Sequence, residues 1–140
     1  TPLFAPYYSG YVYSGNVERI KLFLQYNAEV DQIDGDGRTL LHEASRSGNI
    51  DLMKLLLENN ATVDKADIYG QTPLHIASHH GQFEAIKLLV ENNAAVNQKD
   101  KKGRTPLDVA RGANMLELCN IIGGCGLKLY VKYIFQGFFK

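Results

Sequence analysis

The sequence repeats itself every 33 residues, and this period limits what the chain can fold into. The stretch Thr-Pro-Leu-His-Ile-Ala at residues 72–77 has one counterpart that begins at Thr39 and another that begins at Thr105. A unit of this length cannot bury its apolar face alone, so such units become stable by stacking. We therefore expect a row of similar units, each packed against its neighbours.

Glycine and asparagine recur with the same period and indicate where helices end. Both residue types enter the left-handed helical conformation readily, and a residue in that conformation commonly ends a helix. The two columns are Gly15, Gly48 and Gly81, and Asn27, Asn60 and Asn93. Each unit is therefore predicted to contain two helices, each with its own stop signal.

The first helix of a unit is expected to begin at Thr39, Thr72 or Thr105, where the threonine hydroxyl can accept hydrogen bonds from free backbone N–H groups. The second helix begins just after the glycine column and carries most of the apolar residues. An Asn-Ala-x-Val stretch and a polar segment with a glycine follow it. This pattern predicts an extended turn or short hairpin that projects from the stack.

The Thr-Pro-Leu-His-x-Ala core at this period resembles the ankyrin repeat. The resemblance extends from about Asn16 to Leu129 and is strongest between Gly37 and Val96. It implies an all-α ankyrin-repeat solenoid of stacked helix-turn-helix units with projecting β-turn or hairpin fingers. We expect one domain over residues 1–140, with approximate repeats at 1–33 (degenerate), 34–66, 67–99 and 100–132, and a tail or cap at 133–140.

The two ends of the chain depart from the repeat. Residues 6–13 place aromatic side chains where the repeats have His and Ala, and residues 127–139 are rich in Leu, Tyr, Ile and Phe. Because terminal units of a stack need a soluble outer face, these segments either pack down as caps or lead into further repeats. We favour a segment of a longer array or protein, which also suits a chain that starts at Thr1. For the tail, we favour a cap over an interfacial membrane segment or a peptide docked on a partner.

Composition argues against several classes of function, although local patches of charge remain possible. Lys plus Arg and Asp plus Glu each number 15, so the net charge does not favour nucleic acid or an anionic membrane as a partner. The spacing of Cys119 and Cys125 fits neither a zinc knuckle nor a redox pair. We expect neither a membrane-spanning helix nor a secretory signal, because no apolar run is long enough to span a membrane and no charged segment leads into an apolar one at Thr1. We expect an intracellular protein, cytoplasmic or nuclear, that is monomeric or part of a longer chain.

The histidines are the residues most suggestive of chemistry. His42 and His75 occupy one repeat column, in which Asp108 stands in the next unit, so we interpret them as side chains that bond the backbone of the adjacent repeat. His79 and His80 are neighbours and point about 100° apart on a helix, which suits surface contacts better than a shared metal. Since phosphate-binding loops, zinc-protease pairs and nucleophile elbows are also missing, we predict no enzyme, catalytic residue, metal or cofactor.

The resemblance implies that fingers and first helices line a concave surface for other proteins. The partner is therefore expected to be another protein, and contacts are expected at exposed positions that vary between repeats. These positions are Asp36, Arg38, Arg46, Ser47, Ile68, Tyr69, Gln71, His79, His80, Lys101, Lys102, Arg104 and Arg111. We predict a non-catalytic protein–protein interaction module or, as the alternative, an ankyrin regulatory or assembly segment of a larger enzyme or channel.

Overall fold

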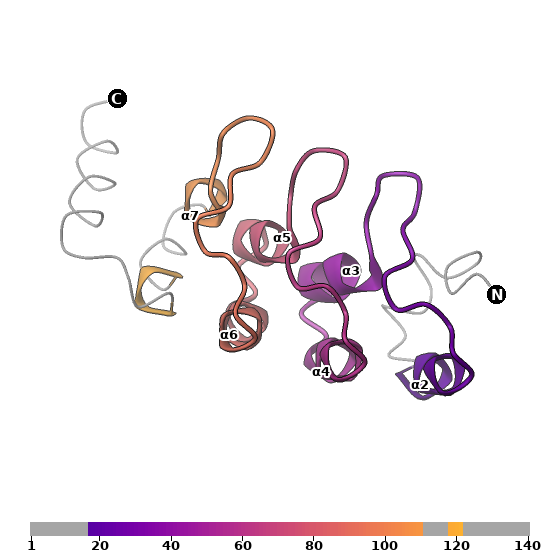
Figure 1. Cartoon of the computed structure of the whole chain (residues 1–140). Helices are drawn as coiled ribbons and strands as arrows, with labels where there is room; N and C mark the ends of the chain where they lie inside the picture. Colours follow the sequence, from indigo (N-terminus) through magenta and orange to yellow (C-terminus); the bar gives the residue numbers. More distant parts are fainter. Residues whose placement is uncertain (1–16, 111–117, 122–140) are drawn as a thin grey trace, which may run out of the picture.

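The computed structural model describes residues 17–110 and 118–121, which form a stack of paired helices (Figure 1). The helices are α2 (Val17–Gln25), α3 (Leu40–Ser47), α4 (Ile50–Glu58), α5 (Pro73–His79), α6 (Phe83–Glu91) and α7 (Pro106–Val109). Residues 118–121 are also helical, and no strand occurs in the part of the chain described. The predicted all-α fold is confirmed. The predictions for the first sixteen residues and for the tail fall outside the described residues.

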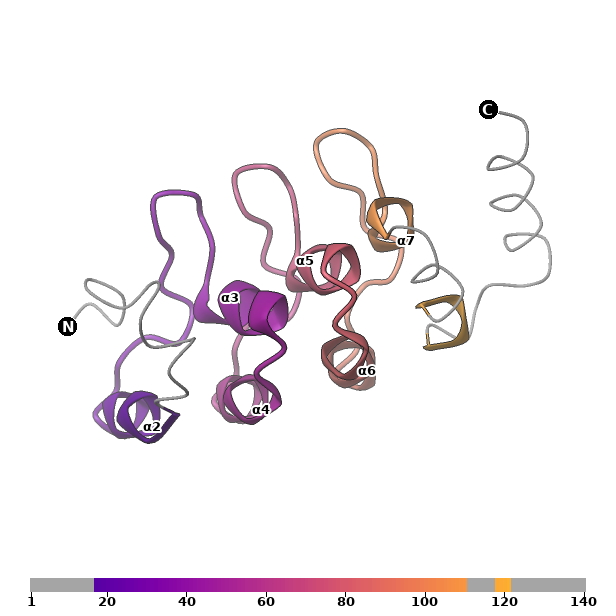
Figure 2. The same ribbon diagram turned by 180° about the vertical axis from the view of Figure 1, so that it is seen from behind.

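The helices form two layers. The first helices of the units, α3, α5 and α7, pack side by side in one row, and α2, α4 and α6 form a second row beside it (Figures 1 and 2). After each second helix the chain runs out into a loop that projects beyond the first-helix row (Figure 1). The two rows and the loops therefore repeat in the same order along the stack.

Threonine begins each first helix, as the sequence predicts. In each case the threonine hydroxyl accepts a hydrogen bond from the backbone N–H of the third helical residue, and the side chain of that residue accepts one from the threonine N–H. This reciprocal arrangement satisfies two backbone donors that would otherwise have no partner. The pairs are Thr39 with His42, Thr72 with His75, and Thr105 with Asp108.

The predicted stop signals adopt the left-handed conformation. Gly48 and Gly81 have φ angles of 72° and 66°, and each ends the turn between the two helices of its unit. The asparagines after the second helices have φ angles of 62°, 66° and 65°; they are Asn27, Asn60 and Asn93. The two sequence columns therefore set the length of both helices in a unit.

The core lies between the two rows and between neighbouring units. Ala44 and Ala77 are fully buried, and because they are small they let neighbouring first helices approach closely. From the second-helix row, α4 contributes Leu52, Met53 and Leu56, all with no exposed surface. Burying one such side chain stabilises a fold by roughly 1.5–3 kcal/mol. A continuous apolar core thus holds the first helices and their loops in fixed positions.

Candidate functional site

Each projecting loop ends in a tight turn that an aspartate holds together. In the second loop the N–H of Asp67 donates to the carbonyl of Gln71 over 2.9 Å, and the N–H of Gly70 donates to the carbonyl of Asp67 over 3.0 Å. The Asp67 carboxylate also accepts from the backbone N–H groups of Tyr69 and Gln71, each at 2.9 Å. We call the turns at residues 34–37, 67–70 and 100–103 the first, second and third fingers; all three close in this way.

Neighbouring fingers are joined by backbone hydrogen bonds. The N–H of Ile68 donates to the carbonyl of Asp36 over 2.9 Å, and the N–H of Lys101 donates to the carbonyl of Tyr69 over 3.1 Å. The side chains at the second finger tip still face solvent, since Ile68 is 46% exposed and Tyr69 is 53% exposed. The finger tips therefore present side chains from a fixed backbone.

Two buried histidines tie each first helix to the next unit. Nε2 of His42 lies 2.9 Å from the carbonyl oxygen of Gln71, and Nε2 of His75 lies 2.9 Å from that of Arg104. For His42 and His75, the prediction that the side chain bonds the backbone of the adjacent repeat is confirmed. Burial lowers the pKa of His42 below its ordinary value, although the bond to Gln71 opposes this shift.

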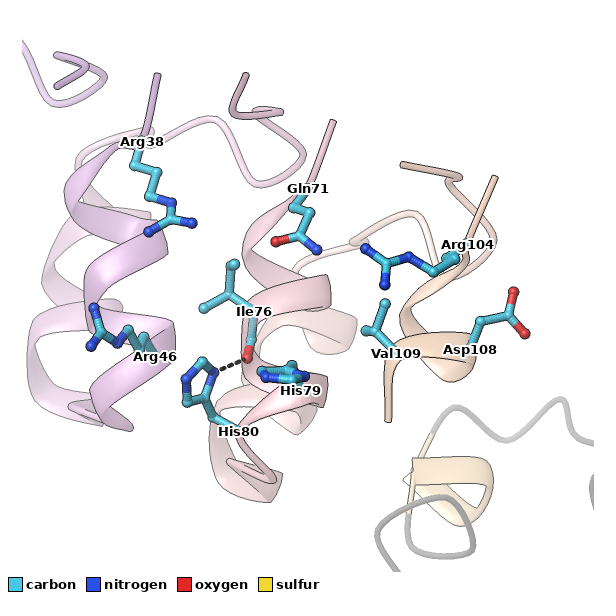
Figure 3. Close-up of a pocket in the computed structure, with 9 residues that line it drawn as sticks. All are labelled: Arg38, Arg46, Gln71, Ile76, His79, His80, Arg104, Asp108 and Val109. Atoms are coloured by element: carbon cyan, nitrogen blue, oxygen red, sulfur yellow. Dashed lines mark hydrogen bonds between the residues drawn. The ribbon is translucent and has the colours of Figure 1, made fainter. Parts of the chain in front are cut away.

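A hollow of about 430 Å³ lies between the first helices at the base of the fingers (Figure 3). Its lining residues are Arg38, Arg46, Gln71, Ile76, His79, His80, Arg104, Asp108 and Val109. In Figure 3, Arg38 and Arg46 lie on the α3 side, Arg104 and Val109 lie on the α7 side, and Ile76 lies between them. We call this cavity the central hollow.

The arginines of the central hollow rest on carboxylates that are more deeply buried. Nε of Arg38 lies 3.2 Å from Oδ2 of Asp67, and Nε of Arg104 lies 2.9 Å from Oδ2 of Asp100. The arginine side chains are 24% and 42% exposed, whereas the two aspartate side chains are 0% and 1% exposed. The guanidinium groups therefore face solvent while their partners lie beneath them.

The third arginine has a looser partner. Nη1 of Arg46 lies 3.7 Å from Oε2 of Glu43, and the Arg46 side chain is 44% exposed. Burial raises the pKa of Glu43 above its ordinary value, and the charge of Arg46 lowers it in part.

The pKa of Asp100, the partner of Arg104, is shifted in the opposite direction. Burial would raise it, but hydrogen bonds from the backbone and side chain of Arg104 hold the pKa of Asp100 below its ordinary value.

The structure gathers about half of the predicted contact residues into the central hollow. Arg38, Arg46, Gln71, His79, His80 and Arg104 line it. Another five lie at the finger tips and are exposed: Asp36, Ile68, Tyr69, Lys101 and Lys102. The hydroxyl of Ser47 donates to the carbonyl of Ala44 in its own helix over 3.2 Å, and Arg111 lies outside the described residues. The central hollow and the finger tips thus form the candidate binding surface.

Sequence reasoning missed three residues of the central hollow: Ile76, Asp108 and Val109. Ile76 and Val109 occupy the variable position of the Thr-Pro-Leu-His-x-Ala core, and this variation in the repeat was the signal that could have identified them. Ile33 was also not predicted as an exposed apolar side chain; it stands just before the first finger and is 54% exposed.

His79 and His80 contact each other at the end of α5. Their ring centroids lie 4.9 Å apart with the rings nearly perpendicular, and Nδ1 of His80 donates to the carbonyl of Ile76 over 2.9 Å (Figure 3). Within residues 17–110 and 118–121, no three His, Cys, Asp or Glu side chains group as metal ligands would. The pair therefore contributes aromatic surface and hydrogen-bonding groups to the central hollow.

Comparison with known proteins identifies a family. A family model described as ankyrin repeats (many copies) matches residues 11–57 and 41–90, which together make up more than half of the chain, and no catalytic domain was identified. No curated protein sequence matches the chain. Among the described residues, no helix has the length and apolar character needed to cross a membrane.

Proposed function

This chain belongs to the ankyrin repeat family, and we propose that it is a non-catalytic protein–protein interaction module whose partner binds the central hollow and the finger tips. Ankyrin repeats generally act as modules of this kind. The proposed contact residues are the predicted ones that lie in these two places, together with Ile76 and Val109.

One observation carries this proposal: the nearly constant repeat columns form the scaffold, whereas most of the predicted contact positions, which vary between repeats, lie at the surface. The columns that stay nearly constant are buried or hold the backbone, as Leu74 and His75 do. Variable columns provide exposed side chains on one side of the stack, among them Tyr69 and His79. Exposed aromatic side chains held by a rigid backbone are common binding hot spots, because they lose little conformational freedom on binding.

The proposal is tested by removing two of these side chains together. In the double variant Tyr69→Ala and His79→Ala, we expect capture of the native partner from extract to fall at least about tenfold, as for loss of a hot spot. Circular dichroism and the melting temperature should stay close to those of the wild type, because both side chains are exposed.

Tyr26→Ala provides the matched control, because Tyr26 is 79% exposed and follows α2 in the second-helix row. It should capture the partner as well as the wild type does. A folded double variant with undiminished capture would refute the proposed binding surface.

A further inference from the structure

The central hollow presents its cations on two sides of an apolar centre. Arg38 and Arg46 stand on the α3 side and Arg104 on the α7 side, with Ile76 between them (Figure 3). The side chains of Ile76 and Val109 form an apolar part of the lining, although each residue is only 6% exposed. A ligand in the central hollow would therefore meet positive charge at both ends and apolar surface in the middle.

The side chain of Arg104 is already fixed in position by its ion pair with Asp100. Arg104 uses Nε to donate to Asp100, and a guanidinium group has five N–H donors in all. Its terminal nitrogens point toward Gln71, across the central hollow (Figure 3). Because Asp100 already fixes the side chain, a ligand that binds those nitrogens costs less side-chain entropy than it would at a mobile arginine.

The acidic residue in the lining is engaged elsewhere. The Asp108 carboxylate accepts a hydrogen bond from the N–H of Thr105 over 2.9 Å, at the beginning of α7. In Figure 3 it points away from Arg104. The carboxylates that pair with the three arginines are buried beneath them, and Glu43, at 9% side-chain exposure, is the most accessible of these partners. Solvent therefore meets hydrogen-bond donors and positive charge in the central hollow.

Helix packing sets the distance between the two cationic sides. Packed helices lie about 8–10 Å apart, so α3 and α7, on either side of α5, are separated by roughly 16–20 Å. An extended peptide advances about 3.3 Å per residue. A peptide that reaches from Arg38 or Arg46 to Arg104 thus spans about five or six residues.

We propose that the central hollow binds an extended segment of a partner protein that carries Asp or Glu side chains at two places, about five or six residues apart, with an apolar side chain between them. Carboxylates match the planar fork of a guanidinium group and form strong, paired hydrogen bonds with it. This inference rests on the proposed function, because it specifies the chemistry of the partner at the same surface.

The test uses dye-labelled synthetic peptides and the whole chain, with binding followed by fluorescence anisotropy. The probe peptide has two glutamates, about six residues apart, on either side of a leucine. We expect it to bind at least about tenfold more tightly than the same peptide with both glutamates replaced by glutamine. Affinity should fall between about 50 mM and 200 mM salt, because salt screens exposed charges.

Substitutions in the protein test whether the glutamate peptide contacts Arg104. Arg104→Glu should weaken binding of the glutamate peptide at least about tenfold, and a peptide with lysine at one end should recover affinity for this variant. Arg104→Gln, which can still donate to Asp100, should weaken binding without disturbing the fold. Lys54→Glu makes the same change of charge on the exposed face of α4 and should leave binding unchanged.

Three results would overturn the inference: equal affinity for glutamate and glutamine peptides, tighter binding of a lysine peptide, or tighter binding of a phosphorylated peptide or an oligonucleotide. The glutamate peptide could fail to bind while the Tyr69→Ala and His79→Ala double variant still loses the native partner. In that case the inference of an acidic partner segment is wrong and the proposed function stands.

Discussion

His42 holds two parts of the stack together through its two ring nitrogens. Nδ1 lies 3.0 Å from the backbone nitrogen of Thr39, which can only donate, and Nε2 lies 2.9 Å from the carbonyl oxygen of Gln71, which can only accept. These partners assign the neutral ring with its proton on Nε2. A second proton on Nδ1 would face the Thr39 N–H, so the folded chain disfavours the charged ring at a buried site.

This arrangement predicts a loss of stability in mild acid. Because burial lowers the pKa of His42, the unfolded chain binds the proton more tightly than the folded chain does. The free energy of unfolding should therefore decrease as the pH falls below about 6.5 and continue to decrease until the folded chain is protonated. One titrating site contributes a slope of at most about 1.4 kcal/mol per pH unit.

Urea unfolding at a series of pH values measures this contribution when the wild type is compared with His42→Gln. The variant should show a shallower decrease than the wild type below pH 6.5. Glu43 remains in both proteins, so its own titration cancels in the comparison. Parallel curves for the wild type and His42→Gln would show that His42 does not titrate as assigned.

At the scale of elements, two glycines in equivalent finger positions differ in their surroundings. Gly70 and Gly103 both have a φ of 76°, a conformation that costs other residues roughly 1–2 kcal/mol. A Cβ atom on Gly70 would lie 2.7 Å from the backbone nitrogen of Lys101, whereas one on Gly103 would meet no atom of the described residues within 4 Å. The second finger is thus packed against the third, whereas no described residue packs against Gly103.

Alanine substitutions should separate the free-energy cost of the backbone conformation from the cost of disturbing the contact between the fingers. Gly103→Ala is expected to lower the free energy of unfolding by about 1–2 kcal/mol, for the backbone conformation alone. Gly70→Ala should cost a further 1–3 kcal/mol or so, because the second and third fingers must move apart. Denaturant unfolding of the two single variants provides the comparison. Equal losses would mean that the contact between the fingers gives way without cost.

The sequence predicts helices and turns well because each depends on a residue type at a fixed position. Thr72 begins a helix and Gly81 ends a turn through their own local chemistry, so a repeat column is enough to place them. Long side chains are different. Arg38 and Arg104 share a column, yet Arg38 reaches Asp67 of the next unit and Arg104 turns back to Asp100 of its own. Such side chains choose between neighbouring partners, and the period does not encode that choice.

The proposed binding surface was predicted only in part for the same reason. Variable columns indicated Arg46 and His79, which line the central hollow, but also Ser47, which bonds its own helix. Ile76 was overlooked because an apolar residue inside a helix normally indicates core. Ile76 lines the central hollow because α3 and α7 stand on either side of α5, an arrangement that arises only when the units stack.

For the whole molecule, stability should be greatest in the middle of the stack. In solenoids each unit contacts only its neighbours, so the inner units gain from two interfaces. Three residues of α4 are buried, Leu52, Met53 and Leu56, whereas Ile20 is the buried residue of α2. Amide hydrogen exchange followed by mass spectrometry should therefore be at least about tenfold slower in α4 than in α2. Equal rates in both helices would indicate that the described stack opens as one unit.

The hydrogen bonds between neighbouring fingers fix the spacing of the finger tips. Because Ile68 is bonded to Asp36 and Lys101 to Tyr69, the three finger tips keep a constant separation. Any partner that touches more than one finger must carry its own contact groups at matching intervals. Inserting a single residue between two such groups would shift one of them by about 3.3 Å, nearly the length of a hydrogen bond. Selectivity then depends on the order and spacing of groups along the partner as much as on their identity.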